Sequence, residues 1–160
     1  MLLFGVDPGL AATGYGVIVA QGSRLRHIDH GVIRTESSDR PGVRLLRIFD
    51  TITALIEEHR PAAAGIESLY FASNVTSALP VAQARGVVLL ALERAAVPAV
   101  EYPPQAIKQA IVGQGRAEKQ QVAEFVRLLL GLEKQPAPDH AADALAAAVC
   151  YHHSNPGLSR

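Results

Sequence analysis

Three acidic residues and one histidine stand at positions where folding could bring them together. Asp7 and Glu67 each end a short apolar run, and His140 and Asp143 lie three residues apart at the start of a helical pattern. Neighbouring strands of an α/β sheet open onto one crevice at their carboxyl ends. A spacing of three residues puts two side chains on one face of a helix. We therefore predict that these four residues form one catalytic site.

A divalent cation would stabilise this cluster. Three carboxylates cannot lose their water and stay ionised unless positive charge compensates them. Oxygen ligands suit Mg²⁺ or Mn²⁺, and an imidazole nitrogen shifts the preference toward Mn²⁺. Two ions about 4 Å apart can activate a water molecule and stabilise the leaving oxygen of a phosphodiester. We expect two Mg²⁺ ions, replaceable by Mn²⁺, with Asp7 contacting both. Glu67 and Asp143 would hold one ion each, and His140 would complete the second.

Each of these residues also has a purely structural interpretation. Asp7 precedes Pro-Gly and could form a turn, and Glu67 could be a solvated acid that protects an edge strand. Asp139 could cap the last helix, and Asp143 in the next turn could interact favourably with the helix dipole. His140 taken alone could be an ordinary surface histidine. Residue types and spacing leave these alternatives open.

The elements that must position the site alternate between strands and helices. The first three strands predict an antiparallel meander, and strand–helix–strand crossovers add two parallel strands. The result is an α/β fold, with a mixed five-stranded sheet and helices on both faces. Strands are expected at 2–7, 14–20, 27–35, 62–67 and 97–102.

Proline and glycine mark the ends of the predicted helices. We expect helices between Pro41 and Pro61, over 75–94, from Pro103 or Pro104 to the glycines at 113 and 115, from Arg116 to Gly131, and from Pro138-Asp139 onward. In the fourth of these helices the periodicity predicts that Val122, Phe125, Val126 and Leu129 face inward.

Composition sets limits on the class of protein. The 160 residues, 49% of them hydrophobic, predict a single domain over 1–160, with 154–160 as a frayed tail. One cysteine excludes an intramolecular disulfide and indicates a reducing, cytoplasmic setting, and no targeting or membrane segment is expected. Fifteen basic and fifteen acidic residues give no net charge, which argues against a simple DNA-coating protein. DNA binding then requires Lys and Arg to lie around a cluster of carboxylates.

Four segments resemble the signature blocks of RuvC-type Holliday junction resolvases. They are GVDPGLAATGYGVI, GIESLYFASNVTSALPVAQARGVV, IKQAIVGQGRAEKQQV and DHAADALAAAV, and they follow one another in order over nearly the whole chain. The resemblance implies a ribonuclease H-like nuclease domain that acts as a homodimer. It further implies an endonuclease that nicks four-way DNA junctions symmetrically with Mg²⁺ or Mn²⁺, in DNA recombination and repair.

The resemblance also assigns the acids of the site. The family's acids fall on Asp7, Glu67 and Asp143, whereas His140 stands where many members have aspartate. This difference leaves open which metal the site prefers and what charge surrounds it. Asp139, next to His140, is expected to point about a quarter-turn away from the site.

Four further residues are implied to bind DNA. Tyr70 matches an aromatic residue that stacks on bases near the crossover, although it could be a core tyrosine. Lys108 and Lys119 match basic positions beside the cleft, although both could be solvated helix lysines. Arg85 lies on a largely apolar helix, where it could serve DNA, the dimer or only local pairing.

The implied partners are a second copy of the chain and a branch-migration complex, made of a tetrameric junction-binding protein and a hexameric motor. The apolar helix over 75–94 is the predicted dimer interface, and a short T-containing sequence is the expected cutting site. Three alternatives stay open. They are an actin-like or sugar-kinase-type phosphotransferase, for which 160 residues are too few, a nuclease acting on ribosomal RNA precursors, and a non-catalytic junction-binding module.

Overall fold

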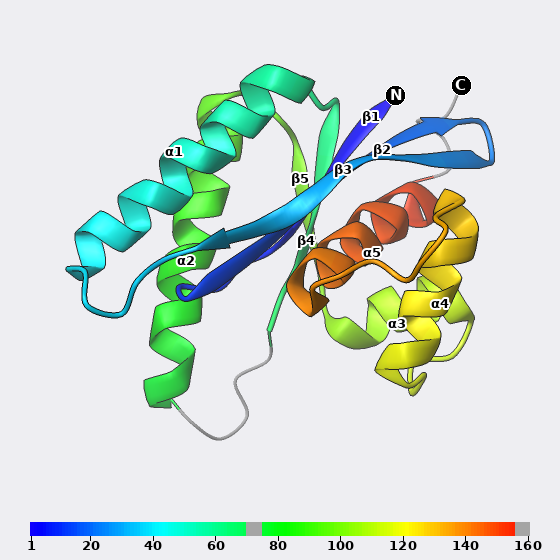
Figure 1. Cartoon of the computed structure of the whole chain (residues 1–160). Coiled ribbons are helices and arrows are strands. Elements are labelled where there is room, and N and C mark those ends of the chain that lie inside the picture. Colours follow the sequence, from blue (N-terminus) through cyan, green and yellow to red (C-terminus); the bar gives the residue numbers. More distant parts are fainter. Residues whose placement is uncertain (70–74, 156–160) are drawn as a thin grey trace.

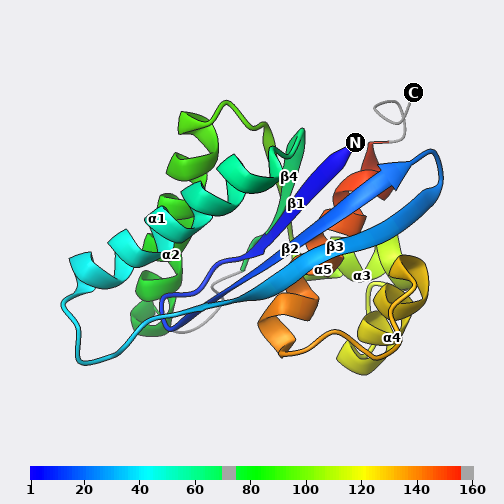
Figure 2. The same cartoon turned by 45° about the horizontal axis from the view of Figure 1, so that its top comes forward.

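A five-stranded mixed sheet forms the centre of the molecule in the computed structural model, which describes residues 1–69 and 75–155 (Figures 1 and 2). The strand order is β3-β2-β1-β4-β5. The first three strands pair antiparallel, and β4 and β5 add to β1 in parallel. This is the predicted α/β arrangement. The strands are β1 (Leu2–Asp7), β2 (Ala12–Gln21), β3 (Arg24–Arg34), β4 (Ala63–Glu67) and β5 (Ala99–Tyr102).

Five helices in the described residues cover the two faces of this sheet. Figure 1 shows α1 and α2 on one face, and α3, α4 and α5 on the other. Helix α5 lies directly on β1, β2 and β4, and α3 and α4 pack outside it. The helices are α1 (Pro41–His59), α2 (Val75–Arg94), α3 (Pro104–Val112), α4 (Lys119–Leu130) and α5 (Asp139–Ser154).

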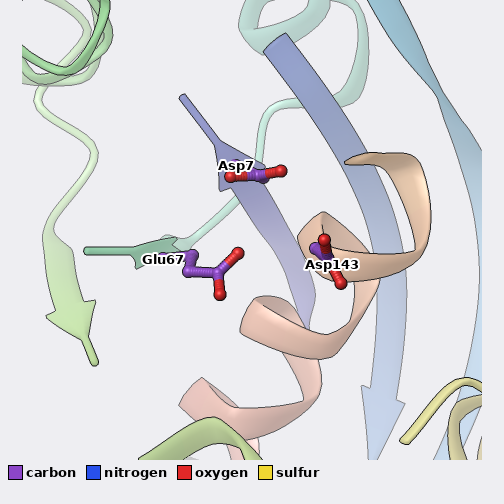
Figure 3. Close-up of side chains that lie close together, drawn as sticks. All are labelled: Asp7, Glu67 and Asp143. Carbon is purple, nitrogen blue, oxygen red and sulfur yellow. The ribbon is translucent and has the colours of Figure 1, made fainter. Parts of the chain in front are cut away.

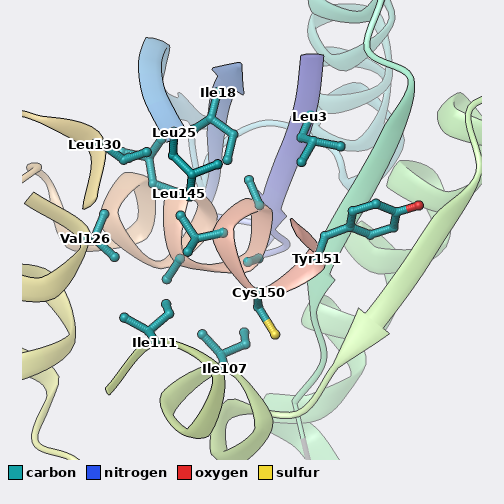
Figure 4. Close-up of a cluster of buried hydrophobic side chains, with 14 of the residues drawn as sticks. Leu3, Ile18, Leu25, Ile107, Ile111, Val126, Leu130, Leu145, Cys150 and Tyr151 are labelled. Atoms are coloured by element: carbon teal, nitrogen blue, oxygen red, sulfur yellow. The ribbon is translucent and has the colours of Figure 1, made fainter. Parts of the chain in front are cut away.

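The alternation of side chains along β1 divides the core into two layers. Leu3 faces α5 and belongs to a cluster that also contains Ile107, Val126 and Leu145, part of which Figure 4 shows. Phe4 and Val6 face α1 and α2 and belong to the second cluster. Successive strand residues point to opposite faces, so Asp7 lies on the same face as Leu3.

Several predicted boundaries differ from the structure. Strands β2 and β3 begin at Ala12 and Arg24, both earlier than predicted. For β3 the reason is Gly22, in the left-handed conformation with φ 59°, which makes a tight turn after which Arg24 already pairs with Gln21. Strand β5 begins at Ala99, later than predicted. Helix α4 begins at Lys119, because the side chain of Glu118 and that of Gln121 form a capping box there.

Two predictions for the later helices are wrong. Phe125 was expected to face inward but is 41% exposed, because the buried side of α4 follows a spacing of four residues through Val122, Val126 and Leu130. Ser154 was assigned to a frayed tail but is the last residue of α5. In the rest of that predicted tail, Asn155 is the C-cap of α5, and 156–160 lie outside the described residues.

Glycines let α5 lie unusually close to the sheet. A β-carbon on Gly5 would lie 1.9 Å from the carbonyl oxygen of Ala144, and one on Gly14 would lie 1.8 Å from that of His140. On Gly65 it would lie 2.3 Å from the carbonyl oxygen of Ala147. We call Gly5, Gly14 and Gly65 the glycine seam. Only hydrogen side chains fit there, so the seam lets the backbone of α5 rest on β1, β2 and β4.

Candidate active site

Asp7 ends β1 and is buried, with 6% of its surface exposed. The turn that follows it is held by Thr13, whose hydroxyl donates to the carbonyl of Gly9 at 2.6 Å and accepts from the Gly9 N–H at 3.2 Å. The Thr13 side chain is itself buried, so water does not compete for these bonds. The backbone directly after Asp7 is therefore fixed. Thr13 was not among the residues predicted from the sequence.

Glu67 and Asp143 approach Asp7 from two other elements. Figure 3 shows the three side chains, from the ends of β1 and β4 and from the first turns of α5. One carboxylate oxygen from each residue can be chosen so that all lie within 4.8 Å of one another. Residues separated by more than 130 positions in the chain therefore share one small volume.

The carboxylates of this cluster resist ionisation. Burial, followed by the charges of Asp7 and Asp143, raises the pKa of Glu67 to about 8. Burial and the charge of Asp143 also raise the pKa of Asp7, although a hydrogen bond with His140 opposes the shift. A divalent cation would reverse this balance by favouring the charged forms. The close spacing of oxygen donors and their mutual repulsion both fit Mg²⁺ or Mn²⁺.

His140 lies beside Asp7, outside this group of three oxygens. Its Nδ1 is 2.7 Å from Oδ2 of Asp7, and about half of its side chain, 49%, is exposed. The structure thus joins His140 to the site through Asp7. The hydrogen bond orients one oxygen of the Asp7 carboxylate, which is the arrangement that positions metal-binding carboxylates in proteins.

Asp139 is not part of the cluster of three acids. Its side chain is 83% exposed and pairs with Lys119 at 3.4 Å. The capping role considered for Asp139 is wrong, because Pro138 occupies the N-cap position and no side chain there caps the helix. Asp139 is instead the first residue of α5.

Lys119 brings a positive charge to the edge of the acid cluster. Its Nζ lies 3.1 Å from Oδ2 of Asp143. Partial burial lowers the pKa of Lys119, but the hydrogen bond and charge of Asp143, with those of Asp139, outweigh this and raise it. The lysine therefore stays charged beside the carboxylates.

A pocket of about 210 Å³ joins the acids to both predicted lysines. Its polar lining comes from Glu67, Asp143, Lys108 and Lys119, and its apolar lining from α3, α4 and α5. Carboxylates and ammonium groups that line the same pocket suit a phosphate that must bind near a cation.

Arg85, a further predicted DNA contact, does not line this pocket. Arg85, on α2, forms a bidentate ion pair with Glu101 of β5, with Nη2 2.6 Å from Oε1 and Nε against Oε2. Local pairing, one of the roles considered for Arg85, is thus present, and 43% of its side chain is exposed. Tyr70 lies outside the described residues.

A mixed sheet of this order, with acids at the ends of β1, β4 and in α5, defines a ribonuclease H-like nuclease. The family model described as "Crossover junction endodeoxyribonuclease RuvC" matches residues 3–152. The chain therefore belongs to the RuvC family of crossover junction endodeoxyribonucleases.

Relatives and solved structures agree over almost the full length. The crossover junction endodeoxyribonuclease RuvC of Treponema denticola is 56% identical over 147 residues, which cover 92% of this chain and 83% of the relative. Thermus thermophilus RuvC is 34% identical, with a TM-score of 0.92 over 99% of this chain and 98% of that one. The same protein in complex with a Holliday junction substrate gives a TM-score of 0.94, covering 99% and 97%.

Proposed function

We propose that this protein resolves Holliday junctions as a structure-selective endonuclease, cutting two equivalent strands by paired symmetric nicks in DNA recombination and repair. The observation that carries the proposal is the cluster of Asp7, Glu67 and Asp143 beside a pocket that also holds Lys108 and Lys119. The similarity to Thermus thermophilus RuvC, which is known in complex with a Holliday junction substrate, supports the choice of DNA substrate.

The site is suited to two Mg²⁺ ions, for which Mn²⁺ can substitute. We assign Asp7, Glu67 and Asp143 as the carboxylate ligands, with His140 as a further ligand or as the group that orients Asp7. When bound, the ions would activate water and neutralise charge on the phosphodiester. Lys119 would hold the phosphate against the acids, because its charge is retained close to Asp143.

A homodimer would place two such sites on one junction. A twofold axis relates two sites in the same way that it relates two equivalent strands of a four-way junction. The proposed interface is α2, which exposes Val75, Leu79 and Leu90 at 74%, 59% and 60%. Within the described ranges, α2 alone has the length and apolar composition of a membrane span, and 28% of its most apolar 18-residue stretch is buried. A second copy of the chain would cover these side chains.

The wider setting is also part of the proposal. We expect a cytoplasmic protein working beside a branch-migration complex of a junction-binding tetramer and a hexameric motor. The single cysteine, Cys150, is buried as a free thiol, which is consistent with a reducing compartment.

The test uses purified protein with a labelled four-way DNA junction and a matching linear duplex, each with Mg²⁺, Mn²⁺ or EDTA. Paired nicks in the junction alone, and only with metal, are the expected result. Selective binding without cleavage would instead support a non-catalytic junction-binding module. Cleavage of structured RNA with inactivity on both DNAs would support the ribosomal nuclease.

A further inference from the structure

Four arginines gather where β3 ends and α1 begins. Arg34 is the last residue of β3, and Arg40 precedes the first residue of α1. Arg44 and Arg47 follow Arg40 at spacings of four and seven residues, which places the three along one side of the helix. Arg34, Arg40 and Arg47 are exposed, and Arg44 is half-buried. We call these four residues the arginine surface.

The arginine surface carries charge that the described part of the protein does not neutralise. No ion pair among the described residues includes any of its members, although Glu36 and Asp39 lie in the same segment. By contrast, Arg85 and Arg127 are each paired with a glutamate through two or more hydrogen bonds. The hydrogen bonds that the arginine surface donates within the described residues go to neutral acceptors, from Arg44 Nε to the Thr35 hydroxyl and from Arg47 Nη1 to the Arg34 carbonyl at 3.5 Å. The positive charge of the arginine surface therefore remains available to an external anion.

A chain of hydrogen bonds connects this surface to the active site. Arg44 Nε donates to the hydroxyl of Thr35 at 2.8 Å, and that hydroxyl donates to the carbonyl of Leu10 at 2.6 Å. The Thr35 N–H donates to the carbonyl of Ala11 at 3.1 Å. Leu10 and Ala11 belong to the loop that leaves the site directly after Asp7. The arginine surface is thus in contact with the loop that follows β1, directly after Asp7.

Arg34 also shares a face of the sheet with the acids. Val32 pairs with Gly14, which lies against the His140 carbonyl, and alternate residues of a strand share a face. The lysines of the pocket come from the opposite flank, on α3 and α4, whereas α1 begins on the far side of the β1–β2 loop (Figure 1). Cations therefore lie on both flanks of the carboxylates.

We infer that the arginine surface binds the phosphates of a DNA arm that leaves the site on the side opposite Lys108 and Lys119. The inference rests on the proposed function and adds a second phosphate-binding surface to it. Guanidinium groups bind phosphate oxygens bidentately, and several unpaired arginines along one line match a repeating phosphate backbone. A protein of zero net charge can bind DNA in this way because its cations are grouped.

The test is the salt dependence of junction binding by Arg40→Gln/Arg47→Gln. The affinity falls as salt rises, so the slope of log affinity against log salt is negative. Each lost phosphate contact should reduce the magnitude of this slope by about 0.9, so the double variant should reduce it by about 2 and weaken binding about tenfold or more. Arg40→Lys/Arg47→Lys keeps both charges and should retain most of the slope. Circular dichroism of each variant checks that the fold is intact.

The matched control is Arg24→Gln/Arg26→Gln. These arginines are also exposed and without an ion pair among the described residues, but they lie on β3 beside the β2–β3 turn, at the opposite end from the first turn of α1 (Figure 2). The control should bind like the unaltered protein. An unchanged slope for the Arg40/Arg47 variant, or an equal loss in the control, would overturn the inference. Junction cleavage by the unaltered protein tests the proposed function separately, so the two failures are distinguishable.

Discussion

His140 and Asp7 meet across the active site, with Nδ1 of the histidine 2.7 Å from Oδ2 of the aspartate. The contact joins the first turn of α5 to the end of β1. It orients the Asp7 carboxylate and partly offsets the rise in its pKa that burial produces. His140 therefore acts on one of the three carboxylates of the proposed metal site.

Replacing His140 should weaken metal binding more than DNA binding, so that more Mg²⁺ is needed for the same cleavage. His140→Ala removes the hydrogen bond to Asp7, and loss of such an orienting partner commonly reduces metal affinity or activity by about 10- to 100-fold. We expect a higher Mg²⁺ concentration for half-maximal cleavage and unchanged junction affinity, measured by metal titration and gel shift. His153→Ala, at the far end of α5, is the control and should behave normally. An unaltered metal titration for His140→Ala would exclude this role.

Replacing Asp7 by Asn should abolish cleavage and leave junction binding. The change removes a ligand charge but no phosphate contact, so the two activities should separate. Asp143→Asn should have the same effect, whereas Asp139→Asn should cleave at nearly normal rates, because the Asp139 side chain is 83% exposed and outside the carboxylate cluster. Cleavage and gel-shift assays on the same junction measure both quantities. Normal cleavage by Asp7→Asn would mean that the site lies elsewhere.

The metal-free protein should lose stability as the pH rises. The pKa of Glu67 is about 8 in the folded protein against an ordinary value of 4.5, so between these values the folded state keeps a proton that the unfolded state has released. The stabilisation is complete below 4.5 and is lost as the pH rises through about 8. We expect the free energy of unfolding to fall by about 2 kcal/mol over this window, after allowing for solvent contact.

Denaturant unfolding in EDTA at several pH values measures this change. Glu67→Gln carries no titrating group at that position, so its stability should vary less across the window than that of the unaltered protein. Added Mg²⁺ should stabilise the unaltered protein most at the alkaline end, because it favours the ionised carboxylates. Parallel pH profiles for the two proteins would contradict the prediction.

Substitution in the glycine seam should displace the active-site end of α5. A β-carbon on Gly14 would lie 1.8 Å from the His140 carbonyl, so Gly14→Ala must push the helix away from β2. We expect a loss of about 3 kcal/mol or more in unfolding free energy, together with loss of cleavage. Gly42→Ala is the control, because a β-carbon there meets nothing within 4 Å and alanine favours a helix. Equal stability of the two variants would show that α5 can shift without cost.

Sequence patterns were sufficient to predict the sheet and to predict that the carboxylates lie close together. Asp7 and Glu67 end apolar runs, and each follows a glycine by two residues, which places Gly5 and Gly65 on the same face as the acid. That glycine pattern was a further signal that a helix packs closely beneath both acids.

Side-chain partners were less predictable than the backbone. The ion pair of Arg85 with Glu101 depends on how α2 lies across β5, which no local pattern encodes. The position of Lys119 between Asp139 and Asp143 likewise depends on the packing of α4 against α5. The outward direction of Phe125 was mispredicted for the same reason, because apolar periodicity alone does not identify which of two adjacent residues meets the neighbouring helix.

The close contact of α5 with the strands also determines how freely this helix can change. Main-chain atoms of α5 rest against main-chain atoms of β1, β2 and β4, so its register along the sheet is set by backbone contact as well as by side-chain packing. A slide by one turn would bring different carbonyls against the strands and carry Asp143 away from its partners. The face of α5 turned toward α3 and α4 can therefore accept new side chains over evolutionary time, provided that the packing volume is kept, without altering the spacing of the acids.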